Sequence, residues 1–95
     1  MDVPLPAGFA LVRRIGPFDA DTLPRGLLAE HRLKPDRWGH LVVQSGRVRL
    51  VWEDASQPSQ DLVAPAEALI PPQAPHHLEL LGDVELAIAF LERAV

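Results

Sequence analysis

The sequence predicts an all-β fold, either a small barrel or a two-sheet antiparallel sandwich of short strands. Apolar and polar residues alternate along several short segments, and alternation with period two is typical of β-strands. Ten prolines and six glycines, about 17% of the 95 residues, separate these segments, against roughly 12% in an average protein. Hydrophobic residues make up 47% of the chain, which is enough for one packed core.

The alternation places strands at 9–15, 27–33, 41–43, 47–53, 60–63, 67–71, 76–81 and 84–91. The main alternative concerns the C-terminal segment VELAIAFLERAV, which contains good helix formers and no breaker. Its strict alternation favours a strand. We therefore expect no helix longer than two turns, and a polar loop where the sequence reads EDASQPSQD.

Two of these segments, LVV and RVRLVWE, are separated by QSGR with its Gly46 and are expected to form a hairpin. In the second segment every other residue from Val48 to Trp52 is apolar and should face the core. Arg47 and Arg49 then fall on the solvent face of the same strand.

Composition excludes several classes of function. The chain has no cysteine, so it forms no disulfide and contains no thiol nucleophile. A net charge of −4 with Lys34 as the one lysine argues against binding to nucleic acid. The N-terminal segment lacks the features of a signal peptide, and no apolar run approaches the ~20 residues of a membrane span. These observations predict a single domain over 1–95 in the cytoplasm, with no nucleic-acid or membrane partner.

Two of the four histidines are predicted to face inward. In HHLELL, His76 shares a face with leucines, and in LLAEHRL, His31 does the same. His77 shares the opposite face with Glu79 and is expected to form a surface pair with it. His40 lies on a mixed face, where a surface or subunit-contact role is expected.

The two inward histidines leave two interpretations open. His31 and His76 are either core residues hydrogen-bonded to backbone or water, or the polar groups of a binding pocket.

Three motifs carry a resemblance to a known family. They are P-x-G-L-L-x-x-H-x-x-K from Pro24 to Lys34, the Trp38–Gly39 pair with the strand that follows, and PP-x-x-x-H-x-x-E from Pro71 to Glu79. In this order and spacing they resemble the small cupin-type domain at the N-terminus of TehB-type tellurite-resistance methyltransferases. The same domain occurs as a stand-alone protein of the YeaR type.

The resemblance covers essentially the whole chain and implies a jelly-roll type of cupin-like domain. The glycine-rich nucleotide loop of a methyltransferase is absent, so we do not expect this chain to methylate a substrate by itself.

The resemblance also implies a metal site. Cupins bind a divalent metal through histidines and a carboxylate from two motifs. His31 lies at the histidine position of the first motif, and the segment from Pro71 to His76 matches the second motif, P-x-G-x-x-H, with Gln73 in place of glycine. The prolines are expected to form a rigid turn that directs His76 into the barrel. A zinc or iron ion held by His31 and His76 is the metal prediction.

At the other positions where cupins carry metal ligands, this chain has residues that do not bind metals. Leu33 stands where a second histidine is expected, Gly39 where the carboxylate is expected, and Ala89 where relatives carry an acidic residue. Zinc and iron sites commonly use three or four protein ligands. The metal prediction therefore rests on two histidines.

The leading functional interpretation is a small binding domain. Its pocket, built around His31 and His76, would hold a divalent metal or a small ligand, in a stress response by family resemblance. The alternatives are a non-catalytic dimeric interaction module and a metal-dependent cupin enzyme acting on a small substrate.

A homodimer is predicted from the apolar residues that alternation assigns to outward faces. A contiguous apolar patch on the surface of a small domain is typical of an interface between subunits. The residues are Trp38, Val42, Leu28 and Leu81.

Overall fold

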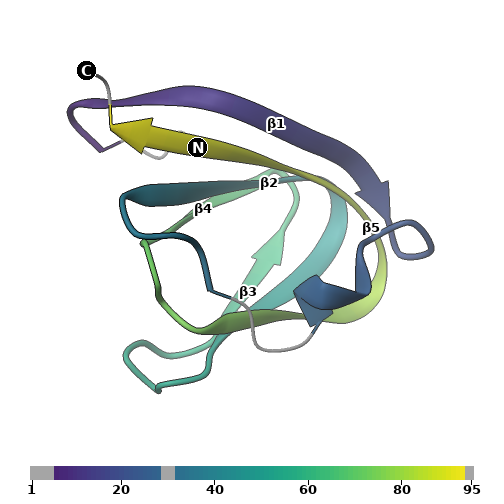
Figure 1. Cartoon of the computed structure of the whole chain (residues 1–95). Coiled ribbons are helices and arrows are strands. Elements are labelled where there is room, and N and C mark those ends of the chain that lie inside the picture. The colour runs from purple at the N-terminus through teal and green to yellow at the C-terminus, as the bar shows by residue number, and fades with distance from the viewer. Residues whose placement is uncertain (1–5, 29–31, 94–95) are drawn as a thin grey trace.

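Figure 1 shows the computed structural model, in which residues 6–28 and 32–93 are described. It contains the strands β1 (Phe9–Asp19), β2 (Arg37–Trp52), β3 (Gln60–Val63), β4 (Ala66–Ile70) and β5 (His76–Arg93), and a turn of 3-10 helix, η1 (Arg25–Leu28). The all-β prediction is therefore confirmed, and the C-terminal segment is a strand. None of the described residues belongs to a helix that is long and apolar enough to cross a membrane.

The strands form one antiparallel sheet in the order β1-β5-β2-β3, and β4 also pairs with β2. The side of β2 that faces away from β5 pairs with two strands. Residues 39–43 pair with β4 and residues 47–50 pair with β3. Within the described ranges no pairing joins β1 to β3. The sheet is therefore open and does not close into a barrel.

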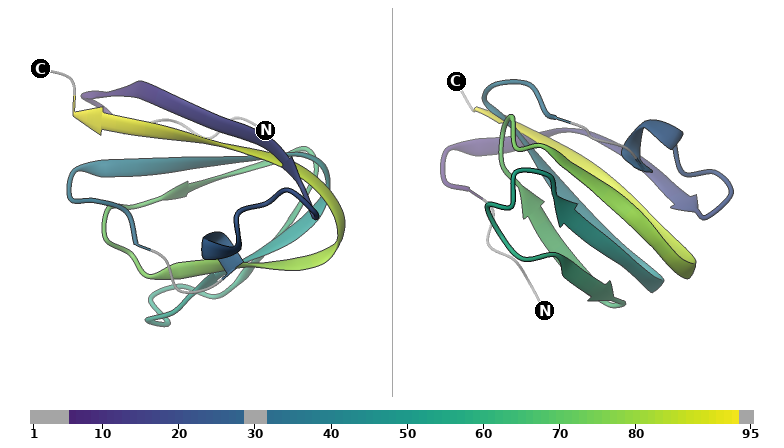
Figure 2. Two further views of the ribbon diagram at one scale, coloured as in Figure 1. Left: turned by 45° about the vertical axis from the view of Figure 1, so that its right-hand side comes forward. Right: turned by 90° about the horizontal axis from the view of Figure 1, so that it is seen from below.

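The sheet folds back on itself because its two longest strands, β2 and β5, bend together (Figures 1 and 2). Each strand contributes one half to each of two layers, so the molecule has the layered form of a sandwich. The inner faces of both layers enclose one core. Its buried members are Leu23, Leu33, Leu41, Val43, Val48, Leu50, Trp52, Leu62, Ala68, Ile70, Leu78, Val84, Leu86 and Ile88.

The predicted hairpin around Gly46 is wrong. Residues 37–52 form a single strand that pairs with β5 in both layers. The segments expected as separate strands at 76–81 and 84–91 are likewise one strand. The predicted faces of RVRLVWE hold nevertheless, since Val48, Leu50 and Trp52 are buried. On the outer face, Arg49 donates from Nε to Asp61 Oδ1 at 2.7 Å.

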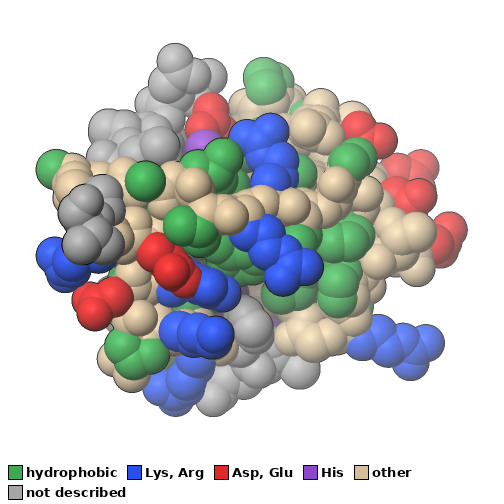
Figure 3. Space-filling view, turned by 45° about the horizontal axis from the view of Figure 1, so that its top comes forward, with side chains coloured by type: hydrophobic (Ala, Val, Ile, Leu, Met, Phe, Trp, Pro, Cys, Tyr) green, Lys and Arg blue, Asp and Glu red, His purple; other side chains and the backbone are tan. Residues whose placement is uncertain are grey.

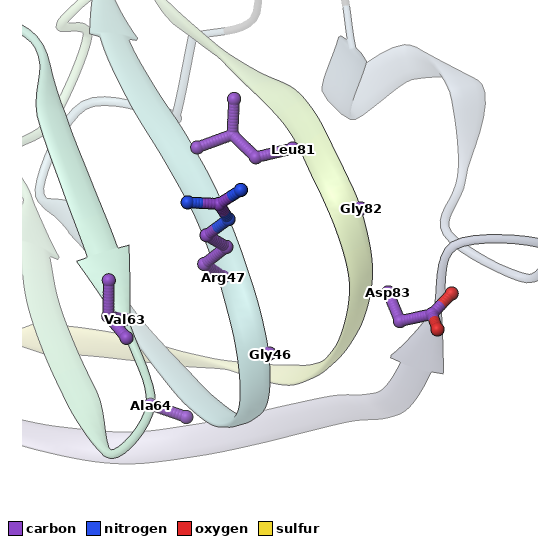
Figure 4. A pocket seen from close by; sticks show the side chains of 7 residues that line it. All are labelled: Gly46, Arg47, Val63, Ala64, Leu81, Gly82 and Asp83. Atoms are coloured by element: carbon purple, nitrogen blue, oxygen red, sulfur yellow. The ribbon is translucent and has the colours of Figure 1, made fainter.

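Gly46 lies in a β-bulge that allows the bend. Its φ is +72°, and a Cβ atom there would lie 1.9 Å from the carbonyl oxygen of Asp83 on β5. Glycine alone combines that conformation with so close a backbone approach. The bulge also exchanges the faces of β2, because odd-numbered residues such as Val43 are buried before it and even-numbered ones such as Val48 after it. Figure 4 shows Gly46 and Gly82 on the two neighbouring strands at this bend.

The strand expected at 27–33 is also wrong where the structure describes it. Leu27 and Leu28 belong to η1, and Arg32 and Leu33 lie outside any strand. Pro24 explains the difference, because its fixed φ favours a tight turn, which closes when the Leu27 N–H donates to the Pro24 carbonyl at 3.0 Å. Residues 29–31 of this segment lie outside the described residues.

Replacing Gly46 should destabilise the protein strongly. For Gly46→Ala we expect a loss of about 3 kcal/mol in the free energy of unfolding, from the left-handed conformation and from overpacking against β5. Gly8→Ala is the matched control, because Gly8 has φ +79° but a Cβ there would meet nothing within 4 Å, so only about 1 kcal/mol is expected. Urea unfolding measures both. Equal losses would show that the contact between β2 and β5 does not require glycine.

Candidate functional site

His76 is the first residue of β5, and the turn before it fixes its position. Gln73 has φ +61°, and its N–H donates to the Leu33 carbonyl at 3.1 Å, which ties this turn to the segment after η1. A positive φ is a conformation that glycine adopts most readily, and Gln73 stands at the glycine position of the resembling motif. His76 is 3% exposed. The prediction that it lies on an inward, apolar face is confirmed.

A hydrogen bond fixes the tautomer of His76. Its Nδ1 lies 2.8 Å from the Ala74 carbonyl oxygen. A carbonyl oxygen only accepts, so Nδ1 carries the proton, and in the neutral ring Nε2 carries a lone pair. This is the form in which a histidine binds a metal or accepts a hydrogen bond through Nε2.

A small chamber lies beside His76 between the two layers. Apart from the imidazole, the described residues of its walls are apolar, and its volume of about 20 Å³ is enough for one water-sized group. We name it the inner chamber. It is lined by Leu27, Leu33, Gly39, Ile70, His76, Ile88 and Phe90.

Two of the positions at which the resemblance leads one to expect a metal ligand lie in this chamber. Leu33 and Gly39 both line it, and they depend on each other, since a Cβ at Gly39 would lie 3.1 Å from Leu33 Cδ1. Ala89 does not line it. Ala89 alternates with Ile88 and pairs in register with His40, so it belongs to the outer face of the layer.

His31 lies outside the described residues, so its position relative to His76 stays a prediction. Among residues 6–28 and 32–93, no group of three or more His, Cys, Asp or Glu side chains is placed to hold a metal ion.

Trp52 adds a second buried polar group near His76. The two residues pair in register, and their ring centroids lie 6.1 Å apart. Trp52 Nε1 is buried and has no hydrogen-bond partner in the described part of the chain. Because buried donors nearly always find an acceptor, this N–H is a second polar position beside His76.

A wider hollow adjoins the inner chamber on the solvent side. It has a volume of about 200 Å³ and shares Leu33 and Phe90 with the chamber. We name it the basic basin, because its other lining residues are Arg32, Lys34 and Arg37. Sequence reasoning missed this grouping. Only the spacing of Arg32 and Lys34 around a buried Leu33 could have indicated it.

The other two histidines contact carboxylates away from the chamber. His40 Nε2 lies 2.6 Å from Glu67 Oε1 on the outer face. His77 bonds to Glu79 through Nε2 at 3.2 Å and to Glu53 through Nδ1, which confirms the predicted surface pair. Burial lowers the pKa of His77, but the hydrogen bonds to Glu79 and Glu53 outweigh burial and raise it above its usual value.

A larger hollow of about 470 Å³ lies at the bend (Figure 4). It is open to solvent, and its lining includes Arg47, Asp83 and the two glycines of the bend. Arg47 and Asp83 are both exposed. The hollow therefore lacks the buried polar group that distinguishes the inner chamber.

The His77 contacts should stabilise the fold at acidic pH. The folded pKa is raised above the unfolded value of about 6.5, so the stabilisation is full below that value and is lost as pH rises through the folded pKa. The difference in unfolding free energy between wild type and His77→Gln should be larger at about pH 5.5 than at about pH 9. Urea unfolding at both pH values measures it, and a pH-independent difference would contradict the pairing.

The fold and the sequence together define the class of this protein, a small all-β domain with a largely apolar chamber that His76 helps to line. A family model described as TehB-like domain matches residues 13–88. The chain therefore belongs to the TehB-like family. No protein with a curated description matches it.

Two solved structures share the fold. The crystal structure of TehB from Haemophilus influenzae superposes with a TM-score of 0.81 at 22% identity, over 92% of this chain and 32% of that chain. The crystal structure of a protein from Escherichia coli strain K12 superposes with a TM-score of 0.85 at 22% identity, over 99% of this chain and 100% of that chain. This chain thus spans about a third of the length of the TehB structure.

Proposed function

We propose that this chain is a small-ligand-binding domain of the cupin type, with its binding site at the inner chamber and the basic basin. The observation that carries the proposal is the composition of the chamber, whose described lining is one buried imidazole among apolar groups. Mostly apolar walls with a few placed polar groups are typical of sites for small molecules.

The tautomer of His76 supports a binding role. Its Nδ1–H is held by the Ala74 carbonyl, so the ring is fixed in one orientation beside the chamber that it lines. The apolar side chain of Leu33 and the absence of a side chain at Gly39 favour an organic ligand over a metal at this site. A zinc or iron ion on His31 and His76 is the alternative occupant.

Removing Nε2 of His76 should abolish most of the binding. His76→Asn keeps a donor for the Ala74 carbonyl and removes Nε2, so the affinity for a small polar ligand should fall about tenfold or more, the cost of one buried hydrogen bond. Amide chemical shifts of Leu33, Ile70 and Ile88 report binding in a screen of small molecules. His40→Ala and His77→Ala are the controls and should bind like wild type.

Metal content of the same variants tests the alternative occupant. If a metal is bound, mass spectrometry should find zinc or iron in the wild type and lose it in both His31→Ala and His76→Ala. Occupancy should then fall as pH drops through roughly 6.5, because neutral imidazole is the metal-binding form. Binding that is unchanged in His76→Asn and His76→Ala would contradict a site at this histidine.

The outer face of the sheet favours a second function, self-association. Trp38 and Val42 on β2 are half-buried. Trp38 and Leu11 pair in register with the same residue of β5, Leu91, so they face the same side of the sheet, whereas Leu91 itself is 1% exposed. Leu11 is 54% exposed. Leu28 and Leu81, also named from the sequence, lie elsewhere, in η1 and at the bend of β5.

We infer that this face forms a two-fold dimer with a second copy of the chain. Arg14 lies at the β1 edge, in register with Ala89, and Glu67 lies at the β4 edge, bonded to His40. A two-fold axis parallel to the strands sets the β1 edge of one copy over the β4 edge of the other. Opposite charges then meet at both edges.

A charge exchange tests this arrangement. The wild type should have a mass of about 21 kDa at tens of micromolar, twice the 10.4 kDa of the chain. Arg14→Glu should shift it toward the monomer, and Arg14→Glu with Glu67→Arg should restore the dimer. Arg47→Glu, at the bend, makes the same change of charge and is the control. Light scattering that gives a monomer for the wild type would contradict the proposal.

A further inference from the structure

We propose that the ligand of this site carries a hydroxyl or carbonyl oxygen that accepts a hydrogen bond from the indole N–H of Trp52. The inference rests on the proposed binding function and adds the chemical class of the ligand. Its basis is Trp52 Nε1, a buried donor for which the described residues provide no acceptor.

The indole of Trp52 is enclosed in the core. Trp52 is 5% exposed and belongs to the hydrophobic cluster between the two layers. Its N–H donates and cannot accept, so only an acceptor can satisfy it. Leaving such a donor unpaired in an apolar interior destabilises the folded protein. An oxygen atom brought in by a bound molecule would remove this cost.

The backbone holds Trp52 beside His76. The two residues lie opposite each other in the pairing of β2 with β5, and the Glu53 N–H donates to the Pro75 carbonyl at 2.9 Å. The ring centroids lie 6.1 Å apart with 58° between the planes, which is the range of contact between aromatic rings. An atom hydrogen-bonded at the edge of the indole can therefore lie beside the imidazole as well.

His76 connects the indole to the inner chamber. Its imidazole lines the chamber and also contacts the Trp52 ring, whereas Trp52 is not among the lining residues. The hydrogen bond between Nδ1 and the Ala74 carbonyl oxygen, at 2.8 Å, keeps the imidazole in this place. A ligand that fills the chamber and extends past His76 would reach the N–H of Trp52.

The described lining of the chamber favours the carbon part of the ligand. Apart from His76 it consists of leucine, isoleucine, phenylalanine and glycine, and the volume is about 20 Å³, which accommodates one methyl-sized or water-sized group. An oxygen buried among such side chains loses its hydrogen bonds to water. The N–H of Trp52 compensates for that loss, so the ligand class is a small molecule with a short apolar segment and one oxygen acceptor.

A water molecule has the same oxygen chemistry as this ligand group. Interior waters pair buried polar groups that have no other partner, and a bound molecule gains affinity only if it reproduces the hydrogen bonds of the water that it displaces. Water and the oxygen of the ligand are therefore two sources of one acceptor, which the experiment has to distinguish.

The test compares 1-butanol with pentane, in which a methyl group replaces the hydroxyl group. Amide shifts of Leu33, Ile70 and Ile88 in the full chain report occupation of the chamber, and both probes should move them. The indole N–H signal of Trp52 is distinguished from that of Trp38 with Trp38→Phe. With 1-butanol it should show a nuclear Overhauser effect to the methylene group next to the hydroxyl, in place of any effect to water.

Trp52→Phe removes the N–H and keeps an aromatic ring. The ratio of the affinities for 1-butanol and pentane should fall about fivefold, the effect of one neutral hydrogen bond. A packing defect that weakens both probes equally leaves this ratio unchanged. Hydrophobic side chains also lie at the surface, as the face drawn in Figure 3 shows, and both probes can bind there unspecifically. Trp38→Phe makes the same replacement on the outer face and should not change the ratio.

The outcomes separate the two levels of the proposal. If Trp52→Phe leaves the ratio unchanged, or if the indole N–H stays in contact with water while 1-butanol fills the chamber, the acceptor class is wrong and the chamber remains the binding site. The Overhauser effects are measured on the wild type, so they decide the question even if Trp52→Phe does not fold. If neither probe shifts the three amides, the proposed binding function fails, and this inference fails with it.

Discussion

The pairing of β2 with β5 through a common bend is the constraint on which the rest of the structure depends. These two strands supply inner residues to both layers, so the core exists only if they change direction at the same place. Gly46 makes this possible, because its backbone approaches Asp83 more closely than any side chain would allow. The bulge also resets which residues of β2 face inward. A bend without it would turn the charged side chains of Arg47 and Arg49 into the core.

The ends of these two strands determine where the candidate site lies. His76 opens β5 and Trp52 closes β2, and the register brings the two rings together. Phe90, near the other end of β5, returns to the same place because the strand has folded back. Residues that are far apart along one strand thus line one chamber, and the prolines before His76 set where the strand begins.

Sequence reasoning succeeded where a local pattern decides the outcome. Alternation placed Val48 and Trp52 in the core and His76 on an inward face, because burial of one face follows directly from period two. It failed at Gly46, since a turn and a bulge need the same positive φ and only the backbone of β5 distinguishes them. It also did not find the basic basin. The Arg37 N–H donates to the Lys34 carbonyl within one local turn, but the contact of this turn with Phe90 on β5 is tertiary and leaves no local pattern.

Within the chamber, the residues at positions 33 and 39 depend on each other. Leu33 fills the space beside position 39, where a Cβ would already lie 3.1 Å from its Cδ1. A carboxylate at position 39, as the cupin resemblance implies, would need that space and would be buried against leucine and isoleucine at a high desolvation cost. Leu33 and Gly39 are therefore compatible with each other and not with a carboxylate ligand. Among the described residues, the charged side chains next to this chamber are therefore those that line the basic basin, and they lie outside the apolar interior.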